Sequence, residues 1–432
     1  MHPLPANENL RLLFWARVRE FAVPPSMIES ATARRAAGDW AGACAAARVD
    51  VDLCVRSLRR AHGGWLAAQV RADLRHLAPD LLRWHFPRIA PDGLLRPGLT
   101  VPLARYRAEA GEFHLVARTP PAWADAGQRI SLALWSRSGR AAGLHPHPHP
   151  DRRYRLDLHR HLWDASRAGE LRERSGRWPP DENAIQLPDG VGPCAVDRWM
   201  AEAALLLRAE GHTGGVVAVR LTSRHRLLLD LGGGDRTRAA PVLPDAATWV
   251  LPDLELLHAG ILNVDQLHPL VAAALRPGHR PGAARKPAAT GNSRLVECRG
   301  ATHRIGVVNG VLVPLDHDPE EIRREELLGA LGGTELPCLR AIDEAHRSPE
   351  NLVDVRARLD HGDAAGALAT VEGLLGPDVL LRSGALRDEL ETAVERQLVH
   401  GLYRAGLAGY GPPRQSAQDT SHRGHPRHAT SL

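Results

Sequence analysis

Apolar residues recur at helical spacing through the first part of the chain. Leu66, Val70, Leu74, Leu77 and Leu81 follow one another at intervals of three or four, and runs of β-branched residues are absent between residue 8 and about residue 86. The pattern predicts a series of helices, interrupted where proline or glycine pairs stand in the sequence.

From about residue 98 to about residue 240 the pattern changes to that of strands. The segments FHLVAR, from Phe113, and RISLALW, from Arg129, alternate as half-buried strands do. Two further strands, VVAVRL and RLLLDL, flank a turn at 222–225. A helix with a broad apolar stripe is expected from Asp197, just ahead of them.

Near residue 309 the chain carries a strong hairpin signal. Asn309-Gly310 stands in the middle of RIGVVNGVLVPL, and this dipeptide tolerates the positive φ values of a type I′ turn. Asp318 is then expected to cap a helix, with Pro319 at its first position and Glu321 completing a capping box. Helices are expected to continue to about Leu407.

These patterns predict an α+β multidomain protein. We expect a helical N-terminal domain, a strand-rich mixed α/β middle domain, a basic flexible linker, a β-hairpin with tetratricopeptide-like helical hairpins, and a disordered tail. Their predicted ranges are 1–95, 96–275, 276–294, 295–410 and 411–432.

One internal similarity links the two helical regions. ARRAAGDWAGACAAA, from Ala33, and ARLDHGDAAGALATV, from Ala357, are identical at eight of fifteen positions. In each copy a glycine is expected to end one helix and an aspartate to cap the next. Each copy resembles the helix-turn-helix unit of tetratricopeptide-like repeats, although an ordinary helical hairpin explains the pattern as well. Such arrays need about three stacked repeats.

Composition excludes several classes of protein. Lys286 is the single lysine, and its context GAARKPAA contains no phosphate-binding turn, which argues against P-loop enzymes and Schiff-base enzymes. No segment approaches the roughly 20 apolar residues of a membrane span, and charges interrupt the N-terminal apolar stretch. We therefore expect a cytoplasmic protein without membrane association.

Cysteines and histidines give no clear catalytic or metal site. The five cysteines form no C-x-x-C pair, so a zinc site built on cysteines, or on a cysteine pair with a histidine pair, is not expected. We interpret His317 as part of the helix start, and His159 and His161 as part of a polar surface run. The sequence thus predicts no catalytic residues, no cofactor, no bound metal and no enzymatic activity.

Positive charge is concentrated in one segment. Residues 276–304 contain seven basic side chains against one acidic side chain, whereas the whole chain carries only +5. A solubilising linker, a site for an acidic protein and a site for the phosphates of DNA all remain open. Where the segment ends, Gly300 allows a close backbone approach. Arg299, His303 and Arg304 offer planar donors suited to phosphates or to a guanine edge.

This end of the segment resembles a module of actinobacterial DNA-binding proteins that combine tetratricopeptide-like helices with the motif Trp-Cys-Gly-Ala-x-x-Arg. Gly300, Ala301 and Arg304 match the motif, while Cys298 and Arg299 replace its tryptophan and cysteine. The resemblance implies binding to duplex DNA, with sensitivity to cytosine methylation as a further possibility.

Our leading hypothesis is a non-enzymatic DNA-binding protein, which would be nucleoid-associated. Its predicted contact residues are Arg294, Arg299, Gly300, His303 and Arg304, with Lys286 adding non-specific attraction. The alternative is a scaffold that binds a protein partner through its helical hairpins, near Trp40 and Leu368.

Overall fold

A computed structural model gives the three-dimensional structure of the chain. It describes residues 6–109, 111–137, 145–176, 187, 191–233, 239–279, 294–298, 300–309, 311–334, 336–377 and 379–408. The chain divides into two compact units, and the division falls near residue 283: unit 1 comprises residues 1–282 and 406–432, and unit 2 comprises residues 283–405. Within the described ranges, no helix has the length and apolar character needed to cross a bilayer.

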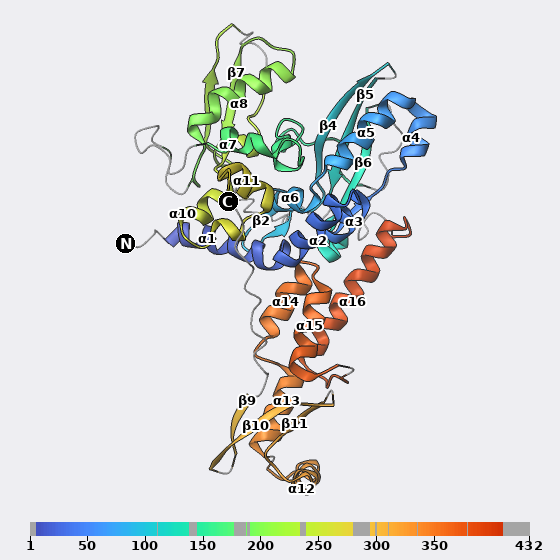
Figure 1. Ribbon diagram of the computed structural model, residues 1–432, viewed down its shortest axis with the longest axis vertical. Coiled ribbons are helices and arrows are strands. Elements are labelled where there is room, and N and C mark those ends of the chain that lie inside the picture. Colours follow the sequence, from blue (N-terminus) through green and yellow to red (C-terminus); the bar gives the residue numbers. More distant parts are fainter. Residues whose placement is uncertain are drawn as a thin grey trace, which may run out of the picture. The chain divides into compact units, whose positions relative to one another are not determined.

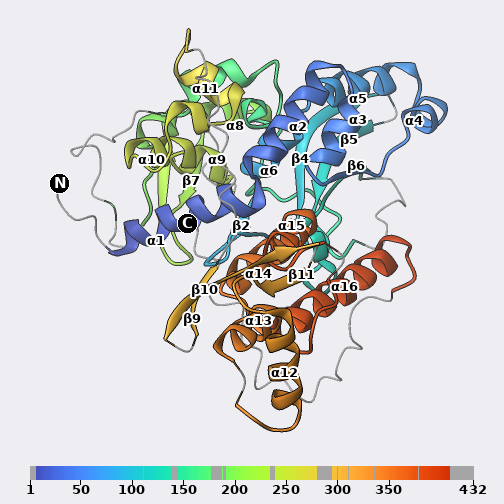
Figure 2. The same cartoon turned by 60° about the horizontal axis from the view of Figure 1, so that its bottom comes forward.

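Unit 1 begins with helices that pack beside an antiparallel sheet with one parallel edge strand. In the sheet, β1 pairs parallel to β6, and β6, β5 and β4 follow in antiparallel order. Figure 2 shows α2, α3 and α5 next to this sheet. The elements are α1 (Ala6–Arg17), a π-helical turn (Val18–Ala22), α2 (Pro25–Ala36), α3 (Trp40–Ala46), β1 (Val49–Val51), α4 (Val55–His62), α5 (Gly64–His76), α6 (Pro79–Trp84), β2 (Arg88–Ile89), β3 (Leu94–Leu95), β4 (Thr100–Ala108), β5 (Gly111–Arg118) and β6 (Ile130–Ser136).

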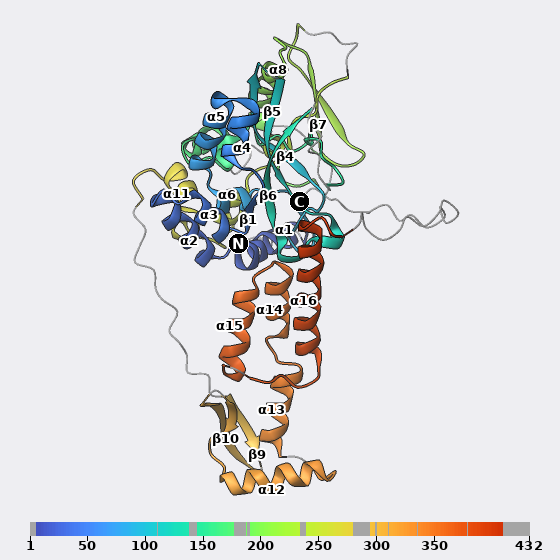
Figure 3. The same ribbon diagram turned by 90° about the vertical axis from the view of Figure 1, so that its right-hand side faces the viewer.

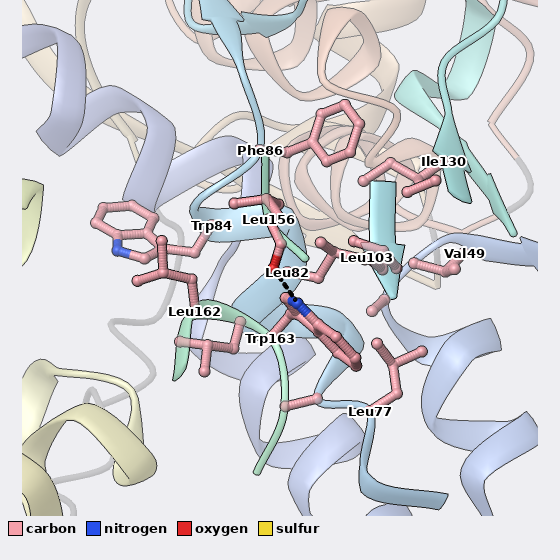
Figure 4. Packing of buried hydrophobic residues seen from close by; sticks show 14 of the residues in the cluster. Val49, Leu77, Leu82, Trp84, Phe86, Leu103, Ile130, Leu156, Leu162 and Trp163 are labelled. Carbon is pink, nitrogen blue, oxygen red and sulfur yellow. Dashed lines mark hydrogen bonds between the residues drawn. The ribbon is translucent and has the colours of Figure 1, made fainter. Parts of the chain in front are cut away.

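A single hydrophobic core joins these helices to the sheet. Leu77 and Leu82 from the helical region pack with Leu103 of β4 and with Trp163, and all four side chains are almost completely buried. The indole Nε1 of Trp163 donates a hydrogen bond of 2.9 Å to the carbonyl of Leu156 (Figure 4), so its polar atom is satisfied inside the core. The boundary expected near residue 95 therefore lies inside one compact unit, because both sides contribute to the same core.

The rest of unit 1 contains a second, smaller core around α8 (Val196–Ala209). Trp199 and Leu206 of this helix pack against Val217 and Val219 of β7 (Val216–Arg220), which forms a hairpin with β8 (Arg226–Asp230). Figure 1 shows α8 beside β7. The remaining elements are α7 (Leu171–Arg174), α9 (Asp245–Thr248), α10 (Pro252–His258), α11 (Pro269–Leu275) and short 3-10 turns at 122–124, 126–128, 160–162, 168–170 and 264–266.

Unit 2 consists of a three-stranded antiparallel sheet followed by helices. The sheet has the order β11-β10-β9, and α13 lies between it and the bundle of α14, α15 and α16 (Figure 3). The bounds are β9 (Arg294–Cys298), β10 (Ala301–Val308), β11 (Val311–Pro314), α12 (Pro319–Ala330), α13 (Pro337–Arg347), α14 (Leu352–Asp360), α15 (Ala364–Leu375) and α16 (Ala385–Arg404).

The α+β class with a helical N-terminal region, a strand-rich middle and C-terminal helices is confirmed. The predicted hairpin is present, with β10 paired to β11 and Asn309 at a φ of +50°. Asp318 caps α12 with Pro319 at the first position, as expected. Its carboxylate accepts from the N–H of Glu320, and Glu321 instead places its carboxylate 3.5 Å from Nδ1 of His317. The tail 411–432 lies outside the described residues, as does most of the linker 276–294.

Candidate metal centre in the C-terminal unit

The register of the unit 2 sheet determines which side chains share a face. Cys298 lies opposite Ala301, and His303 lies opposite Val296 on the same pair of strands. Because successive residues of a strand alternate between faces, Cys298, His303 and Ile305 belong to one face. Helix α13 covers this face, where Cys298 and Ile305 pack in one cluster with Ile342.

Three potential metal ligands meet at the edge of this cluster. Cys298 ends β9, His317 lies in the segment that connects β11 to α12, and Cys338 occupies the first turn of α13. One ligand atom from each residue lies within 4.8 Å of the other two. Both cysteines are fully buried, and the side chain of His317 is only 5% exposed.

The two nitrogens of His317 have different surroundings. Nδ1 lies 3.5 Å from a carboxylate oxygen of Glu321, one turn further along the chain. Nε2 is buried and has no hydrogen-bond partner among the described residues. An imidazole oriented by a carboxylate through one nitrogen, with the other nitrogen free, is the usual arrangement of a metal-binding histidine.

The surroundings of Cys338 disfavour its thiolate form. Burial first, then the hydrogen bond and charge of Cys298 and the charge of Asp316, together raise the pKa of the Cys338 thiol to about 11. A divalent cation would reverse this effect, because a coordinated thiol loses its proton. Two buried thiols and one imidazole form a donor set that suits Zn²⁺, whereas Mg²⁺ and Ca²⁺ prefer oxygen ligands.

The residues predicted to bind nucleic acid are only partly brought together. Gly300 lies in the exposed turn between β9 and β10 with a φ of +81°. Arg294 is the first residue of β9, while Lys286 and Arg299 lie outside the described residues. His303 and Arg304 are neighbours on β10, so they belong to opposite faces of the sheet and do not form one set of donors.

Arg304 and His303 both have protein partners. The Arg304 guanidinium is half-exposed and forms an ion pair of 2.8 Å with Asp316, and its backbone N–H donates to the same carboxylate. These hydrogen bonds lower the pKa of Asp316 to about 2. The ring of His303 stacks on His317, with centroids 4.0 Å apart and planes inclined by 11°. Neither side chain is therefore held ready for a phosphate.

The prediction that His159 and His161 belong to a polar surface segment is wrong. His159 and His161 are each only 2% exposed, because they lie under α8 in a buried polar network. Nε2 of His159 lies 3.2 Å from Glu202, and Arg174 binds both oxygens of that carboxylate. Burial keeps the pKa of His161 well below its ordinary value. Glu202 thus lies between His159 and Arg174 in the interior of unit 1.

Sequence reasoning did not find the cysteine and histidine cluster. Its members are 19 and 21 positions apart along the chain, so no short motif contains them, and the structure groups two cysteines with a histidine where the sequence predicted no metal site. Cys298 ends a strand, His317 follows the predicted hairpin, and Cys338 starts a helix. Only the tertiary pairing of β9 with β10, and the packing of α13 on both, brings them together.

The predicted protein-binding surfaces have different exposures. Leu368 on α15 is 49% exposed, whereas Trp40 at the start of α3 is partly buried against the core of unit 1.

Comparison of the chain with family models, with curated proteins and with solved structures finds no match.

Proposed function

We propose that unit 2 is a zinc-binding module in which Cys298, His317 and Cys338 hold one ion. The observation that carries the proposal is the convergence of three buried donors, within 4.8 Å of one another, from three elements that are distant in sequence. Two thiolates and one imidazole are ligands that zinc takes in structural sites. The role assigned to the ion is structural and non-enzymatic.

A cross-link at this point would stabilise a part of the unit that has little core of its own. Among the described residues, the cluster between the sheet and α13 contains five buried side chains, namely Cys298, Ile305, Leu336, Cys338 and Ile342. An ion bound to Cys298 and Cys338 joins the end of β9 to the first turn of α13. In small metal-binding domains the free energy of metal binding contributes directly to folding.

The test is the metal content of the full chain, purified under reducing conditions. We expect about one zinc per chain by elemental analysis, and none in Cys298→Ser or Cys338→Ser. Cys54→Ser is the matched control, since Cys54 is an exposed free cysteine of unit 1. A wild-type chain that takes up no zinc when titrated with it, or that holds Cys298 and Cys338 as a disulfide, would overturn the proposal.

A second candidate function is contact with duplex DNA through residues 276–304. It is favoured by the seven basic side chains against one acidic side chain in that segment. Residues 283–405 as a whole contain 15 basic and 20 acidic side chains, so any contact would be confined to the segment, weak, and strongly dependent on salt.

A mobility-shift titration at low salt tests this function. We expect Arg299→Ala/Arg304→Ala to bind duplex DNA more weakly than the wild type, with the slope of affinity against salt reduced by about one, because Asp316 already neutralises Arg304. Arg387→Ala/Arg404→Ala removes the same charge from α16 and serves as the control. Equal binding by both double variants, or no binding by the wild type, would exclude the segment as a DNA site.

A further inference from the structure

His303 has an unexplained buried nitrogen next to the proposed zinc site. Its Nδ1 is buried and, within the part of the chain that the structure describes, has no hydrogen-bond partner. The same is true of Nε2 of His317, on which the His303 ring stacks. A buried polar atom without a partner is destabilising, so one such atom on each of two stacked rings requires an explanation.

The fold places His303 where it can reach the cysteines. Ala301 lies directly opposite Cys298, and His303 follows two residues later on the same face of the sheet. Side chains in this diagonal relation across two strands are close enough for long residues to touch. His303 is not one of the three residues whose donor atoms lie within 4.8 Å of one another. Its side chain must therefore turn for Nδ1 to join them.

We propose that His303 is the fourth ligand of the ion, through Nδ1, which gives a closed site of two cysteines and two histidines. This inference rests on the proposed function. The two imidazoles are nearly parallel, with ring centroids 4.0 Å apart. Ligand nitrogens in a zinc tetrahedron are about 3.3 Å apart, given Zn–N bonds of about 2.0–2.1 Å. Because a metal lies near the plane of each imidazole that binds it, the His303 ring must tilt out of this stack when its Nδ1 joins the site.

The fourth ligand decides what kind of site this is. With three protein ligands, zinc keeps a position for water or substrate, which is the arrangement of catalytic sites. With His303 in that position the ion is fully enclosed by protein and its role is structural. The same residue is then unavailable to a phosphate group, so any nucleic-acid contact depends on the arginines of the segment.

Cobalt(II), which takes the place of zinc and is coloured, is the probe for the test. The full chain, stripped of metal and titrated with cobalt, should show the intense visible bands of a tetrahedral ion and a near-ultraviolet band from thiolate-to-cobalt charge transfer. His303→Ala should retain the charge-transfer band but show weaker, shifted visible bands as water enters. Its affinity should fall by at least the ~10-fold that loss of an outer-shell partner costs.

Three further measurements make the result decisive. Added imidazole should restore the visible bands of His303→Ala, which a purely structural role of His303 would not produce. His303→Cys should increase the charge-transfer intensity by about half, since three thiolates then bind in place of two. Thr302→Ala, which changes the neighbouring exposed residue on the opposite face of β10, should leave the spectrum unchanged.

The outcomes separate the two proposals. If the wild type binds no cobalt, both the zinc module and this inference are wrong. If the wild type binds cobalt, but His303→Ala has the same spectrum and affinity, or His303→Cys adds no charge-transfer intensity, only the role of His303 is wrong. His303→Cys keeps the question open to experiment even if His303→Ala fails to fold.

Discussion

Asp363, Gly366 and Arg358 form a compact arrangement at the start of α15. The Asp363 carboxylate accepts from the N–H of Gly366 at 3.3 Å and pairs with Arg358 at 3.2 Å. The same arrangement occurs in unit 1, where Asp39 accepts from Gly42 at 2.8 Å and its carboxylate lies 3.0 Å from Arg34. The internal similarity of the sequence thus corresponds to the same helix cap, including an arginine that the sequence comparison alone did not identify as a partner.

This cap predicts that Gly366 does not tolerate a side chain in the way that other helical glycines do. A Cβ at Gly366 would lie 2.1 Å from Oδ2 of Asp363, so the carboxylate would have to leave its position. Gly366→Ala should therefore lose the cap, which costs about 1 kcal/mol, and this loss offsets the gain of up to about 1 kcal/mol from the better helix former. In the Asp363→Ala background the same substitution should be stabilising. Urea unfolding of the four proteins measures both effects.

The control for this cycle lies in the same helix. A Cβ at Gly373 would meet no atom of the described residues within 4 Å. Gly373→Ala should therefore stabilise the wild type and Asp363→Ala equally, by up to about 1 kcal/mol. If Gly366→Ala behaves like Gly373→Ala in both backgrounds, the contact between Gly366 and Asp363 has no energetic role.

His85 makes the stability of unit 1 depend on pH. Burial lowers the pKa of its imidazole to about 4, although the nearby Asp253 carboxylate, 3.9 Å away, opposes the shift. The unfolded chain takes up a proton below about pH 6.5, whereas the folded protein does not do so until about pH 4. The contribution of His85 to stability is thus complete above pH 6.5 and is lost as the pH falls toward 4.

Between about pH 7.5 and about pH 5, the loss of unfolding free energy caused by His85 amounts to about 2 kcal/mol. We expect the wild type to lose more stability than His85→Gln by this amount, as measured by urea unfolding followed through tryptophan fluorescence. His225→Gln, at an exposed turn between β7 and β8, should show the wild-type dependence on pH. An unchanged pH dependence in His85→Gln would mean that His85 takes up its proton at the same pH in the folded protein as in the unfolded chain.

At the scale of elements, the sequence predicted those turns and helix starts that are determined by residues adjacent in the chain. Asn309 marked the β10–β11 turn because few residues adopt a positive φ, and Asp318-Pro319 marked the start of α12 because the side chain and the ring act within one helical turn. These signals need no tertiary structure, and both features are present.

Elements that depend on distant partners were not predictable in the same way. Strand β1 is only three residues long and exists because it pairs parallel to β6, with Val49 opposite Ile130. Likewise, β9 pairs with β10, and α13 packs on both. The separation of Cys298 from Cys338 along the chain carries no signal of this packing. A candidate metal centre made by such contacts is visible only in three dimensions.

At the scale of the whole molecule, the two units have separate hydrophobic cores. In the described parts of the chain, the two buried clusters of unit 1 contain no residue after Leu275, and the two clusters of unit 2 contain none before Val296. Because each core is formed by its own unit, each unit can unfold as a cooperative transition of its own.

Zinc should then stabilise one transition and leave the other unchanged. An ion that binds the folded unit alone adds stability as its concentration exceeds the dissociation constant, by about 4 kcal/mol at a thousandfold excess. For a unit of this size, such a change corresponds to a shift in Tm of more than about 10 °C.

Calorimetry of the full chain should thus show two transitions, of which a chelator lowers the Tm of only one. In Cys298→Ser/Cys338→Ser that transition should already be low and insensitive to the chelator, which assigns it to unit 2. A chelator that moves both transitions together would show that the units unfold as one, and a chelator without effect on either would contradict a structural role for the metal.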